Sequence, residues 1–298
     1  MPKVVVGTRG SDLAVGQATP LVEHLKACGY DVEWRKFTTS GDAWLAGPLN
    51  SAKAQGNGFF TKELEDSLGQ SEVDLLIHSL KDVAIERPAG VIPACIPLRE
   101  DPSDWLVARK DRPEACVLAT SSVRRNLMLA PVFPQASFTW IRGNVPTRVQ
   151  RVRDGILRDE PVHGTFLAAS GLKRLGLDLS DLEVRALTPD ELLPAPGQGA
   201  LLAETRMDRQ DLVEAFRSWH DEATARCVAV ERAVLKGLGG GCSQPLGTLA
   251  TLDDRGRFHL RAAWAEEGRV IKAEALGEAD VVVTQVVQEL QAQGAPCA

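Results

Sequence analysis

Short β-rich runs alternate with helical patterns through the first two-thirds of this chain. Lys3–Thr8 has the composition of a strand, and Asp12 is a suitable cap for a helix that reaches about Ala27, where Gly29 would end it. Val73–Leu80 is a nearly continuous apolar run, which is typical of strands buried on both faces. This alternation predicts α/β units. Further strands are expected at Tyr30–Thr39, Val117–Thr120, Phe138–Ile141 and Thr165–Ala169, with helices over Phe59–Leu68, from about Val123, from Pro146 and over Leu172–Leu177.

The last third of the chain has a different pattern. Asp211–Lys236 is helical in pattern with a break near His220, and three strand-like runs follow it. Turns at Asp-Arg-Gly and Glu-Glu-Gly separate these runs, which favours a three-stranded antiparallel sheet with a helix on one face. The proline-rich segments near Pro93–Pro102 and Pro189–Pro196 are candidate hinges of the α/β part. The three runs are Leu246–Leu252, Arg257–Ala265 and Val270–Leu276, and the final helix is expected from about Asp280 to Gln293.

Length and charge limit the classes of function. A chain of 298 residues has room for about two domains at roughly 150 residues each. Its formal charge of −6, with no block of Lys or Arg, makes general binding to nucleic acids or membrane surfaces unfavourable. No stretch approaches about 18 continuous apolar residues, and the opening MPKVVVGTRGS lacks the apolar core of a signal peptide. We therefore expect a cytoplasmic enzyme with no nucleic-acid or membrane partner.

The six cysteines give no sign of a metal site. None forms a Cys-x-x-Cys pair and no two histidines stand at zinc-ligand spacing, so no metal is expected. Most of the cysteines should behave as small core residues. Cys242 differs because three glycines, Gly239–Gly241, let the backbone carry its thiol into a cleft. A helix end with an idle cysteine explains the same residues. A cysteine hydrolase is disfavoured because no nearby histidine is visible in the sequence to activate the thiol.

Hydroxyl, glycine and arginine residues recur where strands meet helices. Four junctions carry them: Thr8–Ser11, Thr120–Arg125, Arg142–Arg148 and Ser170–Arg174. In an α/β sheet such junctions line the carboxyl edge, where ligands usually bind. A cation at a helix N-terminus opposes the helix dipole unless an anion sits there, so four such sites predict a ligand with several carboxylates or phosphates. Arginines paired with surface carboxylates explain any single junction, but they explain four together poorly.

The segment His78-Ser79-Leu80-Lys81-Asp82-Val83 closes the buried apolar run. An ammonium and a carboxylate at the mouth of such a strand are partly desolvated, and each then acts strongly on nearby charge. Asp82 could stabilise a cation or shuttle a proton, while Lys81 could bind an anion or form a Schiff base. A surface turn with a local ion pair explains the motif as well. His78 is expected to be a hydrogen-bonded structural residue.

Glycines also precede the helix expected at Phe59–Leu68. Gly56-Asn57-Gly58-Phe59-Phe60 follows an irregular stretch, Pro48–Gln55, and predicts a flexible loop suited to a lid. The loop lacks the Gly-Lys-Ser/Thr ending of a P-loop, and no GxGxxG motif follows a strand. Nucleotide binding is therefore disfavoured.

These motifs together resemble the porphobilinogen deaminase family, whose members are also called hydroxymethylbilane synthases. The similarity extends in order over almost the whole chain, and HSLKDV, TSSVRR and RGNVPTR are its most specific parts. Asn57 stands where many members have Lys, while Lys53 remains as a cation of the loop. Pro146 stands where Gly is frequent, and a proline suits the first turn of a helix. VHGT stands where an acidic residue often precedes the strand. The matching segments are TRGSDLAVGQA, TTSGD, GNGFFTKELE, IHSLKDV, REDPSDW, TSSVRRN, RGNVPTR, SGLKRLG, PAPGQGA, VERAVL and GGGCSQPLG.

The resemblance implies a fold and a division into domains. Two α/β domains would be similar to the lobes of periplasmic binding proteins, followed by a small C-terminal α+β domain with a three-stranded antiparallel sheet and helices. Residues 1–97 with 198–215 would form α/β domain 1, which holds the catalytic Asp and the flexible loop. Residues 98–197 would form the arginine-rich α/β domain 2, and residues 216–298 the cofactor-attachment domain. The family also implies a monomer.

The resemblance further implies a transferase of porphyrin and heme biosynthesis. Four porphobilinogen molecules would be condensed head to tail, each losing ammonia to give an azafulvene cation that the growing chain attacks. The chain would grow on a dipyrromethane primer bound through a thioether to Cys242. Water would then release the linear tetrapyrrole hydroxymethylbilane, which passes to the next enzyme of the pathway.

The family pattern also assigns roles to single residues. Asp82 matches the catalytic carboxylate, which stabilises the cationic intermediates. Every pyrrole ring carries an acetate and a propionate, so the growing chain requires many cations. The implied carboxylate-binding residues are Arg9, Ser11, Lys81, Thr120, Ser121, Ser122, Arg124, Arg125, Arg142, Gly143, Asn144, Arg148, Arg174 and Gln198, and the implied loop residues are Lys53, Asn57 and Phe59.

Two other functions remain open on the residues alone. A non-enzymatic two-lobed protein that binds a polycarboxylate would use the same fold and anion sites, although the GGGC segment and its added domain count against it. A Schiff-base or pyridoxal enzyme using Lys81 would require a glycine-rich phosphate cup, and none is evident.

Overall fold

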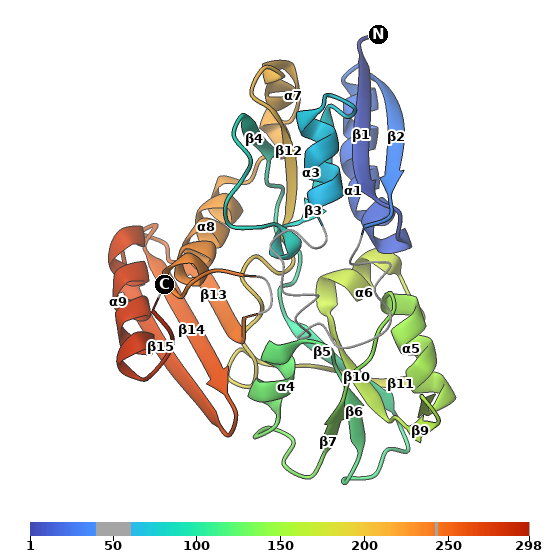
Figure 1. Ribbon diagram of the computed structural model, residues 1–298, viewed down its shortest axis with the longest axis vertical. Coiled ribbons are helices and arrows are strands. Elements are labelled where there is room, and N and C mark those ends of the chain that lie inside the picture. The colour runs from blue at the N-terminus through green and yellow to red at the C-terminus, as the bar shows by residue number, and fades with distance from the viewer. Residues whose placement is uncertain (40–60, 242–243, 298) are drawn as a thin grey trace.

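The computed structural model describes residues 1–39, 61–241 and 244–297. Within these residues, two five-stranded mixed sheets and one three-stranded antiparallel sheet organise the chain, beside a two-stranded hairpin. Figure 1 shows the two larger sheets one above the other, with the third sheet beside them. The predicted fold class, two α/β units with a small C-terminal α+β unit, is confirmed.

The first sheet combines the N-terminal part of the chain with one strand from much later in the sequence. Its strand order is β2-β1-β3-β12-β4, in which β12 alone runs antiparallel to its neighbours. Val6 of β1, Ile77 of β3 and Leu21 of α1 pack together in its core. The elements are β1 (Lys3–Arg9), α1 (Asp12–Ala27), β2 (Asp31–Phe37), α3 (Lys62–Gly69), β3 (Leu75–Ser79), the 3-10 turn η2 (Leu80–Asp82), β4 (Val91–Cys95) and β12 (Leu201–Arg206).

The second sheet repeats this plan. Its order is β11-β5-β10-β6-β7, in which β10, β6 and β7 are parallel while β5 is antiparallel to both β10 and β11. Phe166 of β10 is fully buried in its core. The elements are β5 (Asp104–Arg109), β6 (Val117–Ala119), α4 (Val123–Leu129), β7 (Ser137–Thr139), α5 (Val145–Asp154), β8 (Ile156–Leu157), β9 (Glu160–Pro161), β10 (Gly164–Ala168), α6 (Ala169–Leu175) and β11 (Leu182–Ala186).

Two connections join the larger sheets. Residues 96–103 lead from β4 into β5, and residues 187–200 lead back from β11 into β12. Pro93, expected in a hinge, instead lies in β4, an edge strand in which a missing N–H is tolerated. The chain therefore crosses from one α/β unit to the other twice, and each crossing delivers the antiparallel strand of the sheet it enters.

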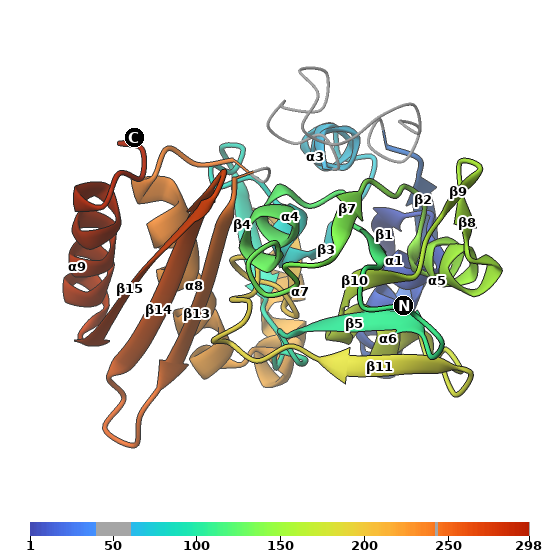
Figure 2. The ribbon, with the colours of Figure 1, turned by 90° about the horizontal axis from the view of Figure 1, so that it is seen from below.

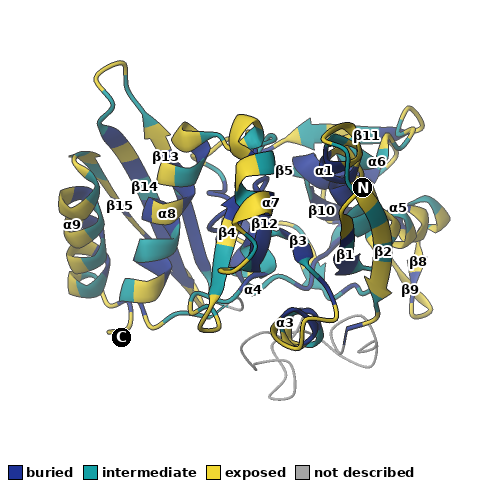
Figure 3. Cartoon of the chain, turned by 90° about the horizontal axis from the view of Figure 1, so that it is seen from above, coloured by how far each residue is buried: buried dark blue, intermediate teal, exposed yellow. Residues whose placement is uncertain are grey.

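The C-terminal unit matches its prediction closely. The helical stretch breaks at His220, which ends η3, and α8 and α9 pack side by side on one face of the sheet while α4 contacts the other face. Figure 2 shows α9 at the outer edge of the molecule. In Figure 3 the central strand β14 is mostly buried, whereas α9 has an exposed outer side. The unit's elements are α8 (Glu222–Gly237), β13 (Leu246–Leu252), β14 (Phe258–Glu266), β15 (Arg269–Gly277) and α9 (Ala279–Ala292). The preceding α7 (Gln210–Ala215) and η3 (Arg217–Trp219) pack on the first sheet.

Several helix starts differ from their predictions. Ser11, not Asp12, caps α1, because its Oγ accepts a hydrogen bond from the Ala14 N–H at 3.3 Å. Asp12 lies in the first turn, where its charge favours the helix dipole. α6 begins at Ala169 rather than Leu172, directly at the end of β10. Among the residues described, no helix combines the length and apolar character needed to cross a membrane.

Candidate functional site

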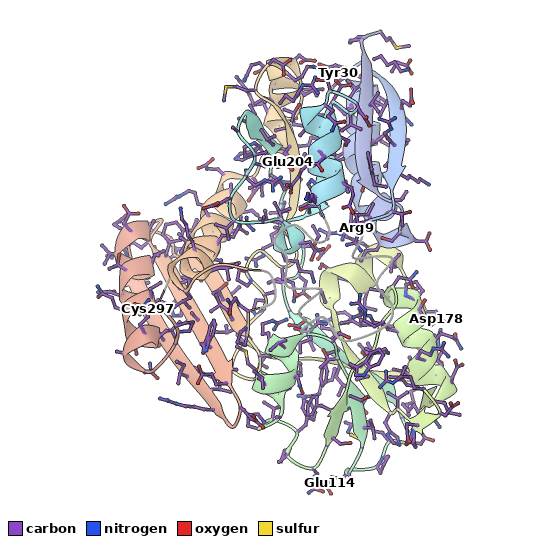
Figure 4. The ribbon with its side chains drawn as sticks, viewed as in Figure 1. Arg9, Tyr30, Glu114, Asp178, Glu204 and Cys297 are labelled. Atoms are coloured by element: carbon purple, nitrogen blue, oxygen red, sulfur yellow. The ribbon has the colours of Figure 1, made fainter. Side chains whose placement is uncertain are left out.

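A cavity of about 190 Å³ lies between the carboxyl ends of the two larger sheets. All four strand-to-helix junctions singled out in the sequence contribute to its wall. Figure 4 shows Arg9 at the end of β1, where the first α/β unit faces the second. The predicted site residues on this wall are Arg9, Ser11, Lys81, Asp82, Arg125, Gly143, Asn144 and Arg148.

On the side of the first sheet, a carboxylate lies close to two cations. Asp82 Oδ2 is 3.6 Å from Arg9 Nη1, and both side chains are partly exposed. Lys81 precedes Asp82 in η2, a turn anchored by the buried Leu80, whose N–H donates to the Ala200 carbonyl at 3.0 Å. The turn therefore presents Lys81 and Asp82 together at the cavity.

The environment of the Lys81 side chain disfavours its charged form. Burial lowers the pKa of Lys81 to about 8, against the raising effect of the neighbouring Asp82 carboxylate. Arg125, on the opposite side of the cavity, contributes to this lowering. A negatively charged ligand group in the cavity would favour the protonated form of Lys81.

On the side of the second sheet, the cavity wall is cationic. Arg148 donates from Nε to the Gly143 carbonyl at 2.9 Å, and no carboxylate of a described residue forms an ion pair with it. Burial, together with the nearby charges of Arg125 and Arg142, lowers the pKa of Arg148 to about 10. Arg142 and Arg148 also line a second pocket that adjoins the same wall at Ser11. Partly buried cations that repel one another suit a ligand with several carboxylates.

A buried carboxylate that sequence reasoning missed, Asp104, organises the adjacent arginines. Its side chain is fully buried and accepts from Arg125 Nη2 at 2.6 Å and from Arg124 Nη2 at 2.8 Å. Burial alone would raise the pKa of Asp104, but Arg124, Arg125 and Lys81 outweigh it and lower the pKa to about 2. The available signal was an aspartate at the start of the apolar run DWLVA.

Arg124 lies away from the cavity wall, although the family pattern implies that it binds carboxylates. Its guanidinium donates to Asp104 and, at 2.6 Å, to the Leu193 carbonyl. Arg125, its neighbour in sequence, bonds Asp104 and the Phe166 carbonyl and still reaches the wall. The structure therefore separates two adjacent arginines into a buried one and a cavity-lining one.

Three predicted hydroxyl residues form local hydrogen bonds behind the wall. Thr120 Oγ1 accepts from the Ser122 N–H at 3.2 Å, and Ser122 Oγ caps α4 by accepting from the Arg125 N–H at 3.3 Å. Ser121 Oγ bonds both backbone groups of Ile141. Asn144 differs, since it caps α5 through a 2.9 Å bond from the Thr147 N–H and also lines the cavity.

Arg174 and Gln198 lie at the connection formed by residues 187–200 rather than on the cavity wall. Arg174 Nη2 donates to the Gly199 carbonyl at 2.9 Å. Gln198 is fully buried and accepts from Lys81 Nζ at 3.2 Å. Both side chains thus act next to the cavity without lining it.

His78 and Gln17 line the cavity, although neither was expected to be a site residue. His78 Nε2 lies 3.0 Å from Glu204 Oε1, so the predicted hydrogen-bonded structural role is confirmed. Gln17 lies on the buried face of α1, and this polar residue among apolar ones was the signal for it. Cys242, Lys53, Asn57 and Phe59 lie outside the described residues.

Comparisons with known proteins match almost the whole length of the chain. The family model described as "Porphobilinogen deaminase, dipyromethane cofactor binding domain" matches residues 4–214, and "Porphobilinogen deaminase, C-terminal domain" matches residues 225–292. A porphobilinogen deaminase of Staphylococcus carnosus is 39% identical over 265 residues, covering 87% of this chain and 83% of the relative. One of Shouchella clausii is 38% identical over 307 aligned positions, covering 99% and 96%.

Two solved structures illustrate a distant likeness to this chain. An ABC transporter structure from Parabacteroides distasonis covers 78% of this chain and 74% of its own, with a TM-score of 0.43 and 14% identity. The periplasmic aliphatic sulphonate binding protein of Escherichia coli covers 79% and 70%, with a TM-score of 0.39 and 12% identity.

Proposed function

Since this chain belongs to the porphobilinogen deaminase family, we propose that the cavity between its two larger sheets is where porphobilinogen is condensed. The enzyme is a transferase of tetrapyrrole synthesis, a hydroxymethylbilane synthase. It joins four porphobilinogen molecules head to tail with loss of ammonia and releases a linear tetrapyrrole. Its cofactor is dipyrromethane.

The observation that carries the assignment of the site is the contrast in charge across the cavity. Arg148 is partly buried, no carboxylate of a described residue forms an ion pair with it, and it stands beside Arg125 and Arg142, so this wall fits the acetate and propionate groups of pyrroles. Arg9, Ser11, Lys81 and Asn144 would bind further carboxylates from the rest of the wall. When bound, dipyrromethane supplies the pyrrole carbon to which the first substrate unit is joined.

Asp82 would act on the positive charge that appears in the substrate as it loses ammonia. Its carboxylate is partly exposed at the cavity and lies 3.6 Å from Arg9, which orients it. A fixed negative charge beside a developing cation lowers the free energy of the transition state, because the carboxylate needs no reorganisation as the charge forms. Pyrrole N–H groups would donate to the same oxygens.

The remaining predicted residues would support this wall. Ser122 and Arg124 would hold α4 and Arg125 in place, with Thr120 and Ser121 fixing the turn that precedes them. Gly143 would expose its backbone to the ligand, and Arg174 would steady the connection at Gly199. Cys242 would carry the primer through a thioether, and Lys53, Asn57 and Phe59 would contact the ligand from the loop.

We propose the same domain limits as before: 1–97 with 198–215, then 98–197, then 216–298. Sheet membership supports them, because β12 returns to the first sheet after β5–β11 have completed the second. A cytoplasmic monomer that passes its product to the next enzyme, and that binds neither nucleic acid nor membrane, is part of the proposal. The alternative of a non-enzymatic polycarboxylate-binding protein has only a likeness of fold in its favour.

The mass of the intact, denatured protein tests this function. We expect an excess equal to two porphobilinogen units, each less one ammonia, which is absent in Cys242→Ser. Cys297→Ser is the matched control, because Cys297 is an exposed cysteine of the same C-terminal unit and should retain the excess. An unmodified mass, both before and after incubation with porphobilinogen, would contradict the proposal.

A further inference from the structure

Gln198 is fully buried where the two connections between the larger sheets pass each other. Its Nε2 donates to the Pro102 carbonyl at 2.7 Å, and this residue belongs to the other connection. Because a carbonyl oxygen only accepts, the amide nitrogen must face Pro102, and Oε1 must face the opposite way. Oε1 accepts from Lys81 Nζ at 3.2 Å. One amide thus joins both connections to the ammonium at the cavity wall.

The backbone around Gln198 has little freedom to move. Its N–H donates to the Ala195 carbonyl at 2.8 Å, and its carbonyl accepts from Arg99 Nε at 2.8 Å. Gly199 has φ +89°, and a Cβ built there would lie 2.3 Å from the Glu100 carbonyl oxygen. The two connections are therefore in backbone contact beside Gln198, and its side chain has one available orientation.

Within the described part of the chain, Lys81 Nζ donates one hydrogen bond, and its acceptor is Gln198 Oε1. The charges facing this ammonium come from three elements. Asp82 in η2 and Asp104 in β5 raise the pKa of Lys81, while Arg124 and Arg125 in α4 lower it along with burial. Gln198 adds a neutral acceptor at 3.2 Å, which restrains the position of the ammonium among these charges.

We propose that Gln198 is a positioning residue that holds the Lys81 ammonium at the cavity wall and ties it to the two connections, rather than a residue that binds carboxylates itself. The proposal rests on the role given above to Lys81 as a cation for ligand carboxylates. A shift of one connection against the other would move this ammonium relative to Asp82. Lys81 is thereby sensitive to the relative placement of the two α/β units.

Two substitutions that change the acceptor in opposite ways test the proposal. Gln198→Met removes the acceptor and should lower the pKa of Lys81, whereas Gln198→Glu places a carboxylate there and should raise it, each by about one unit. The pKa is measured on the holoprotein as the pH dependence of Lys81 labelling by trace acetic anhydride, read from the Lys81 peptide by mass spectrometry.

Thr224→Ala is the matched control. Thr224 Oγ1 accepts from the Arg99 N–H at 3.1 Å, so its loss loosens the same connection without touching Lys81. We expect the pKa of Lys81 to stay unchanged in this variant. Shifts in the same direction for both Gln198 variants, no shift in either, or an equal shift in Thr224→Ala would overturn the proposal. If one Gln198 variant fails to fold, the other tests the proposal alone: the pKa of Lys81 should fall in Gln198→Met or rise in Gln198→Glu, and the opposite shift would overturn the proposal.

Turnover of Lys81→Met tests the proposed role of Lys81 in binding carboxylates independently of the role proposed for Gln198. Normal turnover and an unchanged KM in Lys81→Met would remove the proposed role of Lys81 in binding carboxylates. The labelling result would still show whether Gln198 holds the ammonium, because that measurement does not depend on catalysis.

Discussion

The two sides of the cavity differ in where they keep their carboxylates. On the first sheet's side, Asp82 is on the wall, with its side chain 32% exposed and Arg9 beside it. On the second sheet's side, Asp104 is 0% exposed and lies behind Arg125. The described part of that wall carries Arg125 and Arg148 but no carboxylate. One side therefore offers negative charge to a ligand, and the other offers only positive charge.

This difference explains how one cavity can hold an anionic chain and act on a cation. A buried carboxylate that is bonded by two guanidiniums positions those guanidiniums and is not accessible to a ligand. A carboxylate that is 32% exposed, with an arginine at 3.6 Å, lies at the cavity surface where a ligand can approach it. The second sheet would bind acetate and propionate groups, while Asp82 acts on the reacting carbon.

The largest effect on stability is expected from Asp104→Asn. Removing one partner of a buried charge pair costs about 3–5 kcal/mol, because it leaves buried charge without compensation. Urea unfolding followed by tryptophan fluorescence measures it. Asp111→Asn is the control, since Asp111 pairs with Arg109 on the surface and should change stability little. Equal stability of the two variants would contradict the prediction that the buried carboxylate contributes more to stability than the exposed one.

The stability difference between the wild type and Asp104→Asn should also depend on pH. The pKa of Asp104 is lowered from 3.8 to about 2 in the folded protein, so its ionisation contributes stability above about pH 4 that is lost as the pH falls toward 2. The difference in unfolding free energy between the wild type and Asp104→Asn should therefore shrink over that window. A difference that stays constant from pH 5 to about pH 2 would contradict the assigned charge state.

Arg148→Leu should lower kcat/KM for porphobilinogen by about 10- to 100-fold, the range for losing a hydrogen bond to a charged group. Its folding stability should not fall, because burial and two nearby arginines already disfavour this cation. Arg151→Leu, on the exposed face of the same helix α5, is the control and should leave kinetics unchanged. Matching losses in both variants would argue against a wall specific for carboxylates.

Asn144→Ala should have the smallest effect, a loss of about 1 kcal/mol from removing a helix cap. Asn144 Oδ1 accepts from the Thr147 N–H at the start of α5, the helix that carries Arg148. Asn144→Asp keeps an accepting oxygen and should restore thermal stability. Because it adds negative charge to a wall that holds carboxylates, it should not restore substrate binding. Recovery of both properties would show that Asn144 has no contact with ligand carboxylates.

Much of the fold and half of the site could be predicted from local sequence. The β1–α1 unit, the His78–Asp82 segment and the three C-terminal strands follow from patterns within a few residues. Asp104 could not be assigned, since its partners lie 20 and 21 positions later and only folding brings them together. Arg124 and Arg125 look equivalent in sequence, yet one turns inward because neighbouring helix positions point about 100° apart.

Strand β12 was missed for a similar reason. Leu201–Arg206 pairs with β3 and β4, more than a hundred residues earlier, and its Glu204 is buried against His78 and Arg87. A charged residue within a short apolar run weakens the local signal for a strand. The compensating charges come from other elements, so no local pattern reveals them.

The turnover of Asp82→Asn tests most directly whether Asp82, the carboxylate among the described residues that line the cavity, acts on the substrate cation. The amide keeps the shape and one acceptor oxygen but removes the charge. We expect ammonia release from porphobilinogen to fall by about 10²- to 10³-fold with an unchanged melting temperature. Asp12→Asn, exposed in the first turn of α1, is the control and should keep normal turnover. Near-normal turnover of Asp82→Asn would contradict the account.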